Sequence, residues 1–218
     1  MTFRVETEFP IAFDSADHLH PWGTKRDNNT NENFVQEIMS RFTSDTKLKV
    51  IDLGCSGGKL IRSWLNHTEY AVGLEGSDYS AKADRAEWPK LYNKNLFTCD
   101  VSRSYQIMYD DEPFKANIIT AWELVEHIDP TRVDEFAKMI DRHLVHDGVF
   151  VGSGATGSDA PDGVELHVNI KEKSFWDEKF ETMYYKDMNY PFSHVVREGC
   201  DYNFCYKKVD PNKLTALF

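Results

Sequence analysis

The sequence predicts a three-layer α/β fold, with a doubly wound sheet that is mostly parallel and carries an antiparallel edge strand. Three observations support this class. Short apolar runs typical of buried strands recur along the chain, and polar segments compatible with helices separate them. The length of 218 residues suits one hydrophobic core. The last two apolar runs are joined by a segment containing Pro191 and Gly199, which suggests an antiparallel pair at the sheet edge.

The expected elements can be placed in order along the chain. Apolar runs place strands at 48–53, 70–74, 95–99, 116–121 and 149–151, with the final pair at 182–185 and 202–206. A helix between two strands is marked by apolar residues at offsets of three, four, seven and eleven: Val133, Phe136, Ala137, Ile140 and Leu144. Two further helices are expected, one beginning near Lys59 and one, nearer the N-terminus, that carries Phe34, Val35, Ile38 and Phe42. Repeated strand and helix units predict a parallel sheet covered on both faces.

Net charge, cysteine pattern and apolar runs indicate which partners and which cellular location to expect. The formal net charge is −11 and no run of Lys or Arg forms a dense positive patch, which disfavours long nucleic acid as a partner. The four cysteines form no C-x-x-C pair, which indicates a reducing compartment. The N-terminal stretch lacks the features of a signal peptide, and no long apolar run follows. We therefore expect a cytoplasmic protein without a membrane association.

A glycine-rich turn follows the first expected strand, in the segment VIDLGCSGGKL at 50–60. Glycine permits positive φ and lets a ligand touch the backbone. In an open α/β sheet, ligands bind in the crevice at the carboxyl ends of the strands, which is where this turn is expected. The spacing departs from G-x-G-x-x-G because Ser56 stands at the second glycine position. A dinucleotide pyrophosphate is therefore not the expected ligand, although such a turn can also serve structure alone.

The first three expected strands end in acids, namely Asp52, Glu75 and Asp100. Glu75 comes about 20 residues after the turn, at the spacing where a carboxylate accepts the ribose hydroxyls of a nucleoside. A single acid at a strand end is ordinarily a solvated loop residue. Three at successive strand ends indicate a ligand site at one edge of the sheet.

The pattern D-x-G-x-S-x-G at 52–58, followed by these acids and by the strand ANIITAW, resembles the class I S-adenosylmethionine-dependent methyltransferases, which have a Rossmann-like fold. The resemblance implies S-adenosylmethionine as the cofactor. It also implies that Asp52 holds the amino group, that Glu75 accepts from the ribose, and that Asp100 and the Val101 backbone contact adenine. The full set of implied cofactor-binding residues is Asp52, Gly54, Ser56, Gly58, Glu75, Asp100, Val101 and Trp122.

An acid and histidine cluster follows the fourth strand, beside the place implied for the transferable methyl group. Glu123, Glu126 and His127 are spaced so that a helical turn would put them on one face. The E-x-x-E-H segment, together with the later His167, is similar to the metal-binding motif of small-RNA terminal 2′-O-methyltransferases. A comparable arrangement is found in ubiquinone-pathway O-methyltransferases. The resemblance implies Mg²⁺ or Mn²⁺ held by Glu123, Glu126, His127 and His167.

Two interpretations of this cluster remain open. In the first, the metal binds an acceptor hydroxyl and lowers its pKa, and the catalytic residues are His127, His167 and Glu123. Without a metal, either histidine is a candidate general base. In the second, Glu123 and Glu126 complement the dipole of a helix start, and His127 bonds a neighbouring loop.

Several other residues are weaker candidates for the pocket, with core packing or solvation as the alternative for each. They are His18, His20, Trp22, Lys25, Arg26, Trp122, Phe175, Trp176 and His194.

We expect one methyltransferase domain over residues 1–218. Residues 1–45 form an N-terminal cap, 46–154 the cofactor-binding core, and 155–218 a substrate-side loop, helix and edge strands. The leading hypothesis is O-methylation of a small polar acceptor, such as a sugar, a polyol or a glycan. The alternatives are a terminal RNA 2′-O-methyltransferase, which the negative charge disfavours, and a non-catalytic adenosyl-binding partner, which the acid and histidine cluster disfavours.

Overall fold

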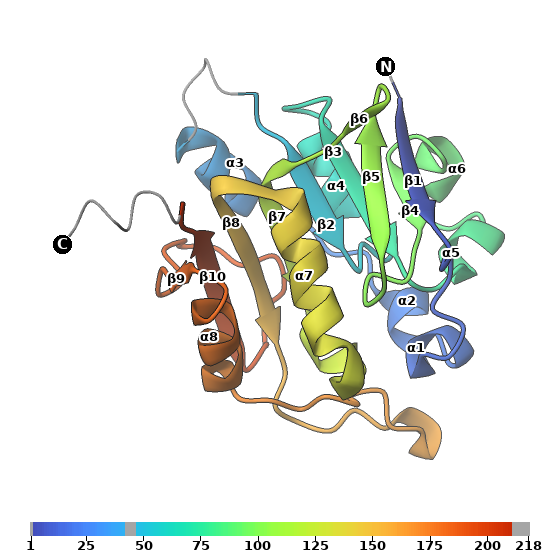
Figure 1. The fold of residues 1–218 in the computed structure, drawn as a ribbon. Coiled ribbons are helices and arrows are strands. Elements are labelled where there is room, and N and C mark those ends of the chain that lie inside the picture. The colour runs from blue at the N-terminus through green and yellow to red at the C-terminus, as the bar shows by residue number, and fades with distance from the viewer. Residues whose placement is uncertain (1, 42–46, 211–218) are drawn as a thin grey trace.

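The computed structural model describes residues 2–41 and 47–210. Its centre is a seven-stranded sheet in the order β4-β3-β2-β7-β8-β10-β9 (Figure 1). The parallel strands are β2 (Val50–Leu53), β3 (Ala71–Glu75), β4 (Leu96–Thr98), β7 (Ala116–Trp122) and β8 (Leu144–Gly154). The strand order reverses between β2 and β7, which is where an open α/β sheet opens a ligand crevice.

The predicted antiparallel pair is confirmed at one end of this sheet. Strand β10 (Tyr202–Lys208) runs antiparallel to β8 and also to β9 (Tyr185–Asp187), which forms the edge. The antiparallel strand β10 is therefore one position in from the edge, and β9 has the same direction as β8.

Helices cover both faces of the sheet, as predicted. On one face, α7 (Val133–His143) and α8 (Lys173–Glu181) share a hydrophobic core with the central strands. On the other face, α3 (Glu32–Arg41), α4 (Lys59–Trp64) and α6 (Trp88–Leu91) form a second core. Strands buried on both faces need apolar side chains in both directions, which explains the continuous apolar runs in the sequence.

A second sheet, which the sequence analysis did not anticipate, lies beside the first. It is antiparallel, in the order β1-β5-β6, and pairs β1 (Phe3–Thr7) with β5 (Tyr105–Tyr109) and β5 with β6 (Glu112–Pro113). The chain after β1 then crosses the carboxyl ends of β3 and β4. There the N–H of Ala12 donates to the carbonyl of Gly76, and the N–H of Asp100 donates to the carbonyl of Phe9, both at 2.9 Å.

Short helices gather near these strand ends. Figure 1 shows α1 and α2 at the same end of the sheet as the segment that follows β8. The short helices are α1 (Ala16–Leu19), α2 (Trp22–Arg26), α5 (Tyr79–Lys82) and the 3-10 helices η1 (Val125–His127), η2 (Pro130–Arg132) and η3 (Pro161–Gly163).

Two sequence expectations change in detail. Leu144, expected at the end of a helix, instead begins β8, because its backbone is already extended at φ −100° and ψ 133°. The expected N-terminal helix is α3, but Phe42 and the expected boundary at 45/46 lie outside the described residues. All four cysteines are free. Within 2–41 and 47–210, no helix has the length and apolar character needed to cross a membrane.

Candidate functional site

A pocket of about 320 Å³ lies at the carboxyl ends of the parallel strands. It extends from the tips of β3 and β4 to η1 and the segment after β8, and the N-terminal segment covers it. A volume of this size is at the lower end of those that hold small ligands. Nine of the predicted site residues line it: Gly54, Ser56, Glu75, Asp100, Val101, Trp122, Glu123, His127 and His167.

The glycine-rich turn brings its backbone to the pocket wall. Gly54 and Ser56 have left-handed φ values of 70° and 46°. A Cβ on Gly54 would lie 3.0 Å from the Cδ1 atom of Leu124, so this position leaves little room for a side chain. The hydroxyl of Ser56 donates to the carbonyl of Asp27 at 2.7 Å, which connects the turn to the end of α2.

Gly58 has a structural role rather than a place in the pocket wall. It precedes α4 with φ at 84°, in the left-handed region that glycine favours. A Cβ there would lie 2.5 Å from the Cδ1 atom of Leu96 on β4, so the glycine allows close packing of turn and strand. Gly58 does not line the pocket, and its contact with the cofactor stays a prediction.

Glu75 presents a fixed carboxylate to the pocket. Its Oε2 atom accepts the N–H of Ser56 at 2.7 Å, and its Oε1 atom accepts the N–H of Ser77 at 3.1 Å. Burial raises the pKa of Glu75 to about 6, although these two donors oppose the shift. Each oxygen keeps a second lone pair that a ligand hydroxyl can use.

Asp100 is held from two sides at the tip of β4. Its Oδ1 atom accepts the N–H of Ser102 at 3.0 Å and its hydroxyl at 2.6 Å. Its Oδ2 atom lies 3.5 Å from Nε of Arg103 and 3.6 Å from Nη1 of Arg132. The carboxylate is therefore oriented and its charge balanced before any ligand arrives.

Asp52 does not line the pocket. It is buried, and its Oδ1 atom accepts the hydroxyl of Thr120 at 2.6 Å. The two residues face each other in the register of β2 and β7. Burial raises the pKa of Asp52 to about 7. The bond to Thr120 joins two central strands, and the direct contact of Asp52 with a ligand amino group stays a prediction.

The segment after β7 is not the regular helical turn expected from its spacing. Glu123 has a left-handed φ of 50°, and the 3-10 helix η1 begins only at Val125. The carboxylate of Glu123 instead accepts the hydroxyl of Ser153 on β8 at 2.7 Å. The expectation that Glu123 shares a face with Glu126 and His127 is therefore wrong.

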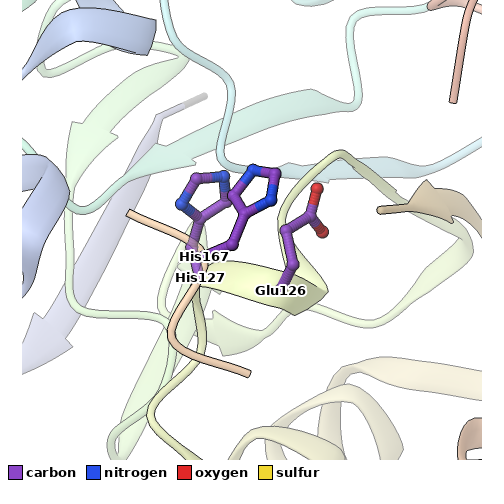
Figure 2. Close-up of side chains that lie close together, drawn as sticks. All are labelled: Glu126, His127 and His167. Carbon is purple, nitrogen blue, oxygen red and sulfur yellow. The ribbon is translucent and has the colours of Figure 1, made fainter. Parts of the chain in front are cut away.

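Glu126, His127 and His167 do come together (Figure 2). One potential ligand atom from each lies within 4.8 Å of the other two. The two imidazole rings are nearly perpendicular, with centroids 4.8 Å apart. This group joins the turn after β7 to the loop after β8, as the sequence predicted for these three residues.

The carboxylate of Glu126 is unusual in its surroundings. It is fully buried, and within the described residues neither of its oxygens has a hydrogen-bond partner. Burial raises its pKa to about 7, even though the neighbouring His127 favours the charged form. Because buried polar groups are nearly always paired, the position suits an additional proton donor or cation.

In both histidines Nδ1 lies beside an oxygen, in His167 as a hydrogen bond and in His127 as an ion-pair contact without hydrogen-bond geometry. That atom of His127 lies 2.7 Å from Oδ2 of Asp17, and that of His167 lies 2.6 Å from the carbonyl oxygen of Gly157. Burial lowers the pKa of His127, but the ion pair with Asp17 outweighs burial and raises it to about 9. Nε2 is therefore the nitrogen left for a ligand in His167, and in His127 once the extra proton that Asp17 stabilises has been lost.

Asp17 is one of the pocket residues that the sequence did not predict, together with Asp14 and Arg132. It lies on α1, in the N-terminal segment, and lines the pocket. Its only sequence signal was its place in a stretch rich in histidine and acids, DSADHLH at 14–20, far from the E-x-x-E-H segment. No local spacing links Asp17 to His127.

The weaker candidates, Trp122 apart, do not line the pocket. Arg26 and Lys25 lie over the ring of Trp22, at 4.9 Å and 5.6 Å from its centroid. Trp176 is a core residue, as its alternative interpretation held. The remaining candidates outside the pocket wall are His18, His20, Phe175 and His194.

Comparisons with known proteins agree with this geometry. The profile of a family described as a methyltransferase domain matches residues 25–198. Among curated protein sequences, none matches this chain.

Solved structures show the same fold. A crystal structure of an S-adenosylmethionine-dependent methyltransferase from Clostridium acetobutylicum has a TM-score of 0.61 at 12% identity, covering 88% of this chain and 98% of that one. An amino pentose methyltransferase from Micromonospora echinaspora, with S-adenosylmethionine bound, has a TM-score of 0.59 at 11% identity, covering 87% and 95%. The glycopeptide N-methyltransferase MtfA, also with S-adenosylmethionine, has a TM-score of 0.56 at 13% identity, covering 84% and 95%.

Proposed function

This chain belongs to the S-adenosylmethionine-dependent methyltransferases, and we propose that it methylates a hydroxyl oxygen of a small polar acceptor such as a sugar or polyol. One observation carries the proposal. A single pocket has carboxylates at the strand tips and also His127 and His167, and the buried carboxylate of Glu126 lies within 4.8 Å of both histidines. The first set suits the adenosyl part of the cofactor, and the second suits an acceptor that must lose a proton.

The strand tips fit the cofactor by their chemistry. When bound, S-adenosylmethionine supplies an electrophilic methyl group on a positively charged sulfur. Glu75 has free lone pairs for the ribose hydroxyls, and Asp100 with the Val101 backbone can contact adenine. Gly54 and Trp122 also line the pocket wall.

The acceptor end fits a hydroxyl group. For methyl transfer to oxygen, the acceptor must give up its proton during or before attack. The Nε2 atom of His167 is the group that would receive this proton, because its Nδ1 atom already bonds the carbonyl of Gly157. His127, whose pKa is raised to about 9 beside Asp17, could serve only after losing its own second proton. Leu166 and Val168 add an apolar wall beside them.

We also propose that Glu126, His127 and His167 hold a divalent ion such as Mg²⁺ or Mn²⁺, with Glu123 excluded from the ligand set. The fit rests on the unpaired, buried carboxylate of Glu126 and on the two anchored imidazoles, since histidine ligands commonly have their second nitrogen bonded to a carboxylate or carbonyl. An ion there supplies a positive charge that lowers the pKa of a bound hydroxyl.

The ligand group is slightly open for one ion. Separations of up to 4.8 Å exceed the spacing between ligands at a single ion. That spacing is about 3 to 4 Å for bonds of about 2.1 Å. A small inward rotation of the rings would close this gap.

The pocket walls favour a small acceptor over RNA. Lining carboxylates include Asp14, Asp17 and Asp159, whereas Arg132 and Arg197 are already paired with acids. The phosphates of an RNA would meet mainly negative charge in this pocket. Non-specific RNA binding depends on Lys and Arg side chains that are not already paired with acids.

An acceptor screen with label tracing tests the proposal. The protein is incubated with methyl-deuterated S-adenosylmethionine and separate pools of sugars, polyols, amines and short RNAs, and products are identified by tandem mass spectrometry. We expect label on a hydroxyl oxygen of a small molecule, and less label with a Glu75→Ala variant at limiting cofactor concentration. Label found only on nitrogen, carbon or RNA would overturn the proposed acceptor class.

A further inference from the structure

The N-terminal segment of residues 9–19 crosses the pocket and contacts both of its ends through two acids. We propose that Asp17 is a positioning residue for His127, and that the ion pair of Asp14 with Arg132 latches this segment over the cofactor end. Cofactor binding and the acceptor-side histidine are then coupled through one short stretch of chain. The inference rests on the proposed function in one respect, because it takes His127 to serve the acceptor.

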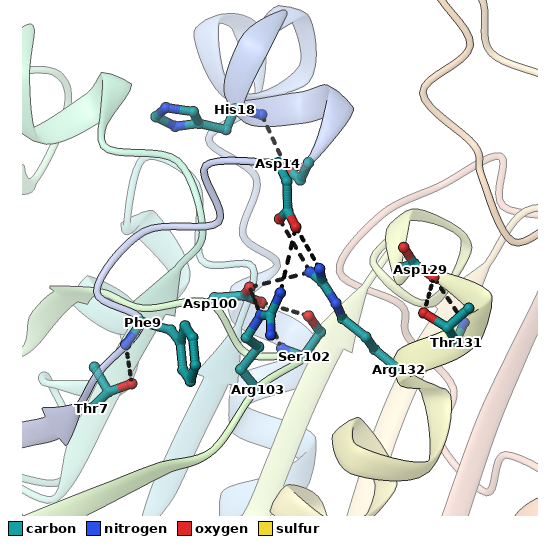
Figure 3. Close-up of polar contacts among 11 residues, drawn as sticks. Thr7, Phe9, Asp14, His18, Asp100, Ser102, Arg103, Asp129, Thr131 and Arg132 are labelled. Atoms are coloured by element: carbon teal, nitrogen blue, oxygen red, sulfur yellow. Dashed lines mark hydrogen bonds and ion pairs between the residues drawn. The ribbon is translucent and has the colours of Figure 1, made fainter.

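The latch is a cluster of two acids and two arginines at the cofactor end (Figure 3). Both carboxylate oxygens of Asp14 bond the guanidinium of Arg132, through Nη1 at 3.1 Å and through a closer contact with Nη2. Nη2 of Arg103 lies 3.5 Å from the same carboxylate. Both arginines also approach Asp100. The same two guanidinium groups therefore contact the implied adenine-binding acid and an acid of the N-terminal segment.

Backbone contacts place this segment directly on the strand tips. The N–H of Asp100 donates to the carbonyl of Phe9, and the guanidinium of Arg103 lies 4.6 Å from the centre of the Phe9 ring. On the neighbouring strand, the N–H of Ala12 donates to the carbonyl of Gly76. Any ligand that displaces or tightens the tips of β3 and β4 therefore acts on residues 9–14.

The other acid reaches the opposite end of the pocket. Asp17 lies on α1, whose first turn is capped by the hydroxyl of Ser15, and its carboxylate contacts Nδ1 of His127 at 2.7 Å. The two side chains are only 25% and 18% exposed, so solvent screens this pair less than a surface pair. This ion-pair contact restrains Nδ1, and so favours one orientation of the ring and of Nε2.

A short turn leading into α1 joins the two contacts. Asp14 lies in this turn, which the N–H of Ser15 closes by donating to the carbonyl of Ala12, and Asp17 lies in the first turn of α1. A shift of the latch therefore moves α1, and the Asp17 to His127 contact moves with it.

A double-mutant cycle on S-adenosylhomocysteine affinity, measured by calorimetry without acceptor, tests the latch. The variants are Asp14→Asn, Arg132→Gln and the pair together. We expect each single change to weaken binding by about three- to tenfold, and the double variant to be no weaker than the weaker single. Asp134→Asn is the matched control, because it breaks an ion pair with Lys179 at the start of α7, away from the pocket, and should change affinity less than about twofold.

Histidine-selective ¹⁵N NMR tests the coupling. The ring signals of His127 are assigned by their loss in His127→Gln. We expect Asp17→Asn to shift them and Asp17→Glu to restore them towards the native position. Saturating S-adenosylhomocysteine should move these signals in the native protein, and by less than about half as much in Asp14→Asn if the latch carries the coupling.

The outcomes decide each part of the inference. Additive effects in the cycle, or native affinity in both single variants, contradict the latch. Unchanged ring signals in Asp17→Asn contradict the positioning role, and a native response to the ligand in Asp14→Asn contradicts the coupling. Neither measurement uses an acceptor or methyl transfer, so failure here is distinguishable from failure of the proposed acceptor class.

Discussion

The Oε2 atom of Glu75 accepts the backbone N–H of Ser56 at 2.7 Å, which joins the acid at the end of β3 to the glycine-rich turn after β2. The two features that identified the cofactor site in the sequence are therefore one unit in space. The bond fixes the carboxylate at the pocket wall while leaving lone pairs for a ligand.

Replacing Glu75 by Ala should weaken S-adenosylhomocysteine binding by about tenfold or more, because charge-assisted hydrogen bonds of roughly 1.5 to 3 kcal/mol are lost. Calorimetry measures the dissociation constant, and circular dichroism checks that the fold is retained. Glu181→Ala, an exposed glutamate at the end of α8, is the control and should bind as the native protein does. A native dissociation constant for Glu75→Ala would assign the ribose to another residue.

S-Adenosylmethionine and S-adenosylhomocysteine should raise the melting temperature, whereas NAD should not. Ligands that bind only the folded state stabilise it in proportion to the logarithm of their concentration. NAD lacks a site because Ser56 interrupts the dinucleotide glycine spacing. Differential scanning fluorimetry over a range of ligand concentrations measures the shifts. Equal stabilisation by NAD would show that the turn does not discriminate as proposed.

Chelation should abolish methyl transfer while leaving S-adenosylhomocysteine affinity within about twofold, because the implied adenosyl contacts do not involve the Glu126 group. Mn²⁺ or Mg²⁺ should restore transfer, and His167→Ala should require more metal for half-maximal rate. Crystals soaked in Mn²⁺ should give an anomalous peak among Glu126, His127 and His167. Full activity in excess chelator would leave the histidines as general bases.

If the acids after β7 serve structure alone, removing them has a different signature. A helix-start role predicts a stability loss of about 1 kcal/mol and no change in metal dependence. Glu126→Gln, measured by denaturant unfolding with and without Mn²⁺, separates the two cases. Metal should stabilise the native protein and leave the variant nearly unaffected.

Because His143 is buried, the free energy of unfolding should decrease as the pH falls. Burial lowers its pKa to about 4 from an ordinary 6.5, because the neutral ring accepts the N–H of Ile107 at 3.1 Å inside the core. The unfolded chain binds this proton more readily, so the contribution is present above pH 6.5 and is lost as the pH falls towards 4. The full effect is about 3 kcal/mol.

Urea unfolding of the native protein and of His143→Gln between pH 7 and pH 4 measures the contribution of His143 to the free energy of unfolding. Other buried acids titrate in the same range, so the difference between the two proteins is the relevant quantity. We expect the native advantage over the variant to shrink as pH falls. A constant difference across the range would show that His143 does not carry the acid sensitivity.

Local patterns in the sequence predicted the main sheet and the acids at the cofactor end of the pocket. Apolar runs marked β2, β3, β4, β7 and β8, because strands buried on both faces must be apolar throughout. The acids Glu75 and Asp100 were found because parallel strands end at a common edge, so residues at successive strand ends meet without any knowledge of packing.

Side-chain pairing between distant segments was decided by the tertiary structure alone. The spacing of the E-x-x-E-H segment placed Glu123 with Glu126, but a left-handed backbone at Glu123 directs it to Ser153 instead. The second sheet pairs Phe3–Thr7 with Tyr105–Tyr109, and Asp17 meets His127. The periodicity of apolar residues indicates which face of a helix or strand is buried. Which distant residue a side chain contacts depends on how the elements pack, and no local spacing encodes that.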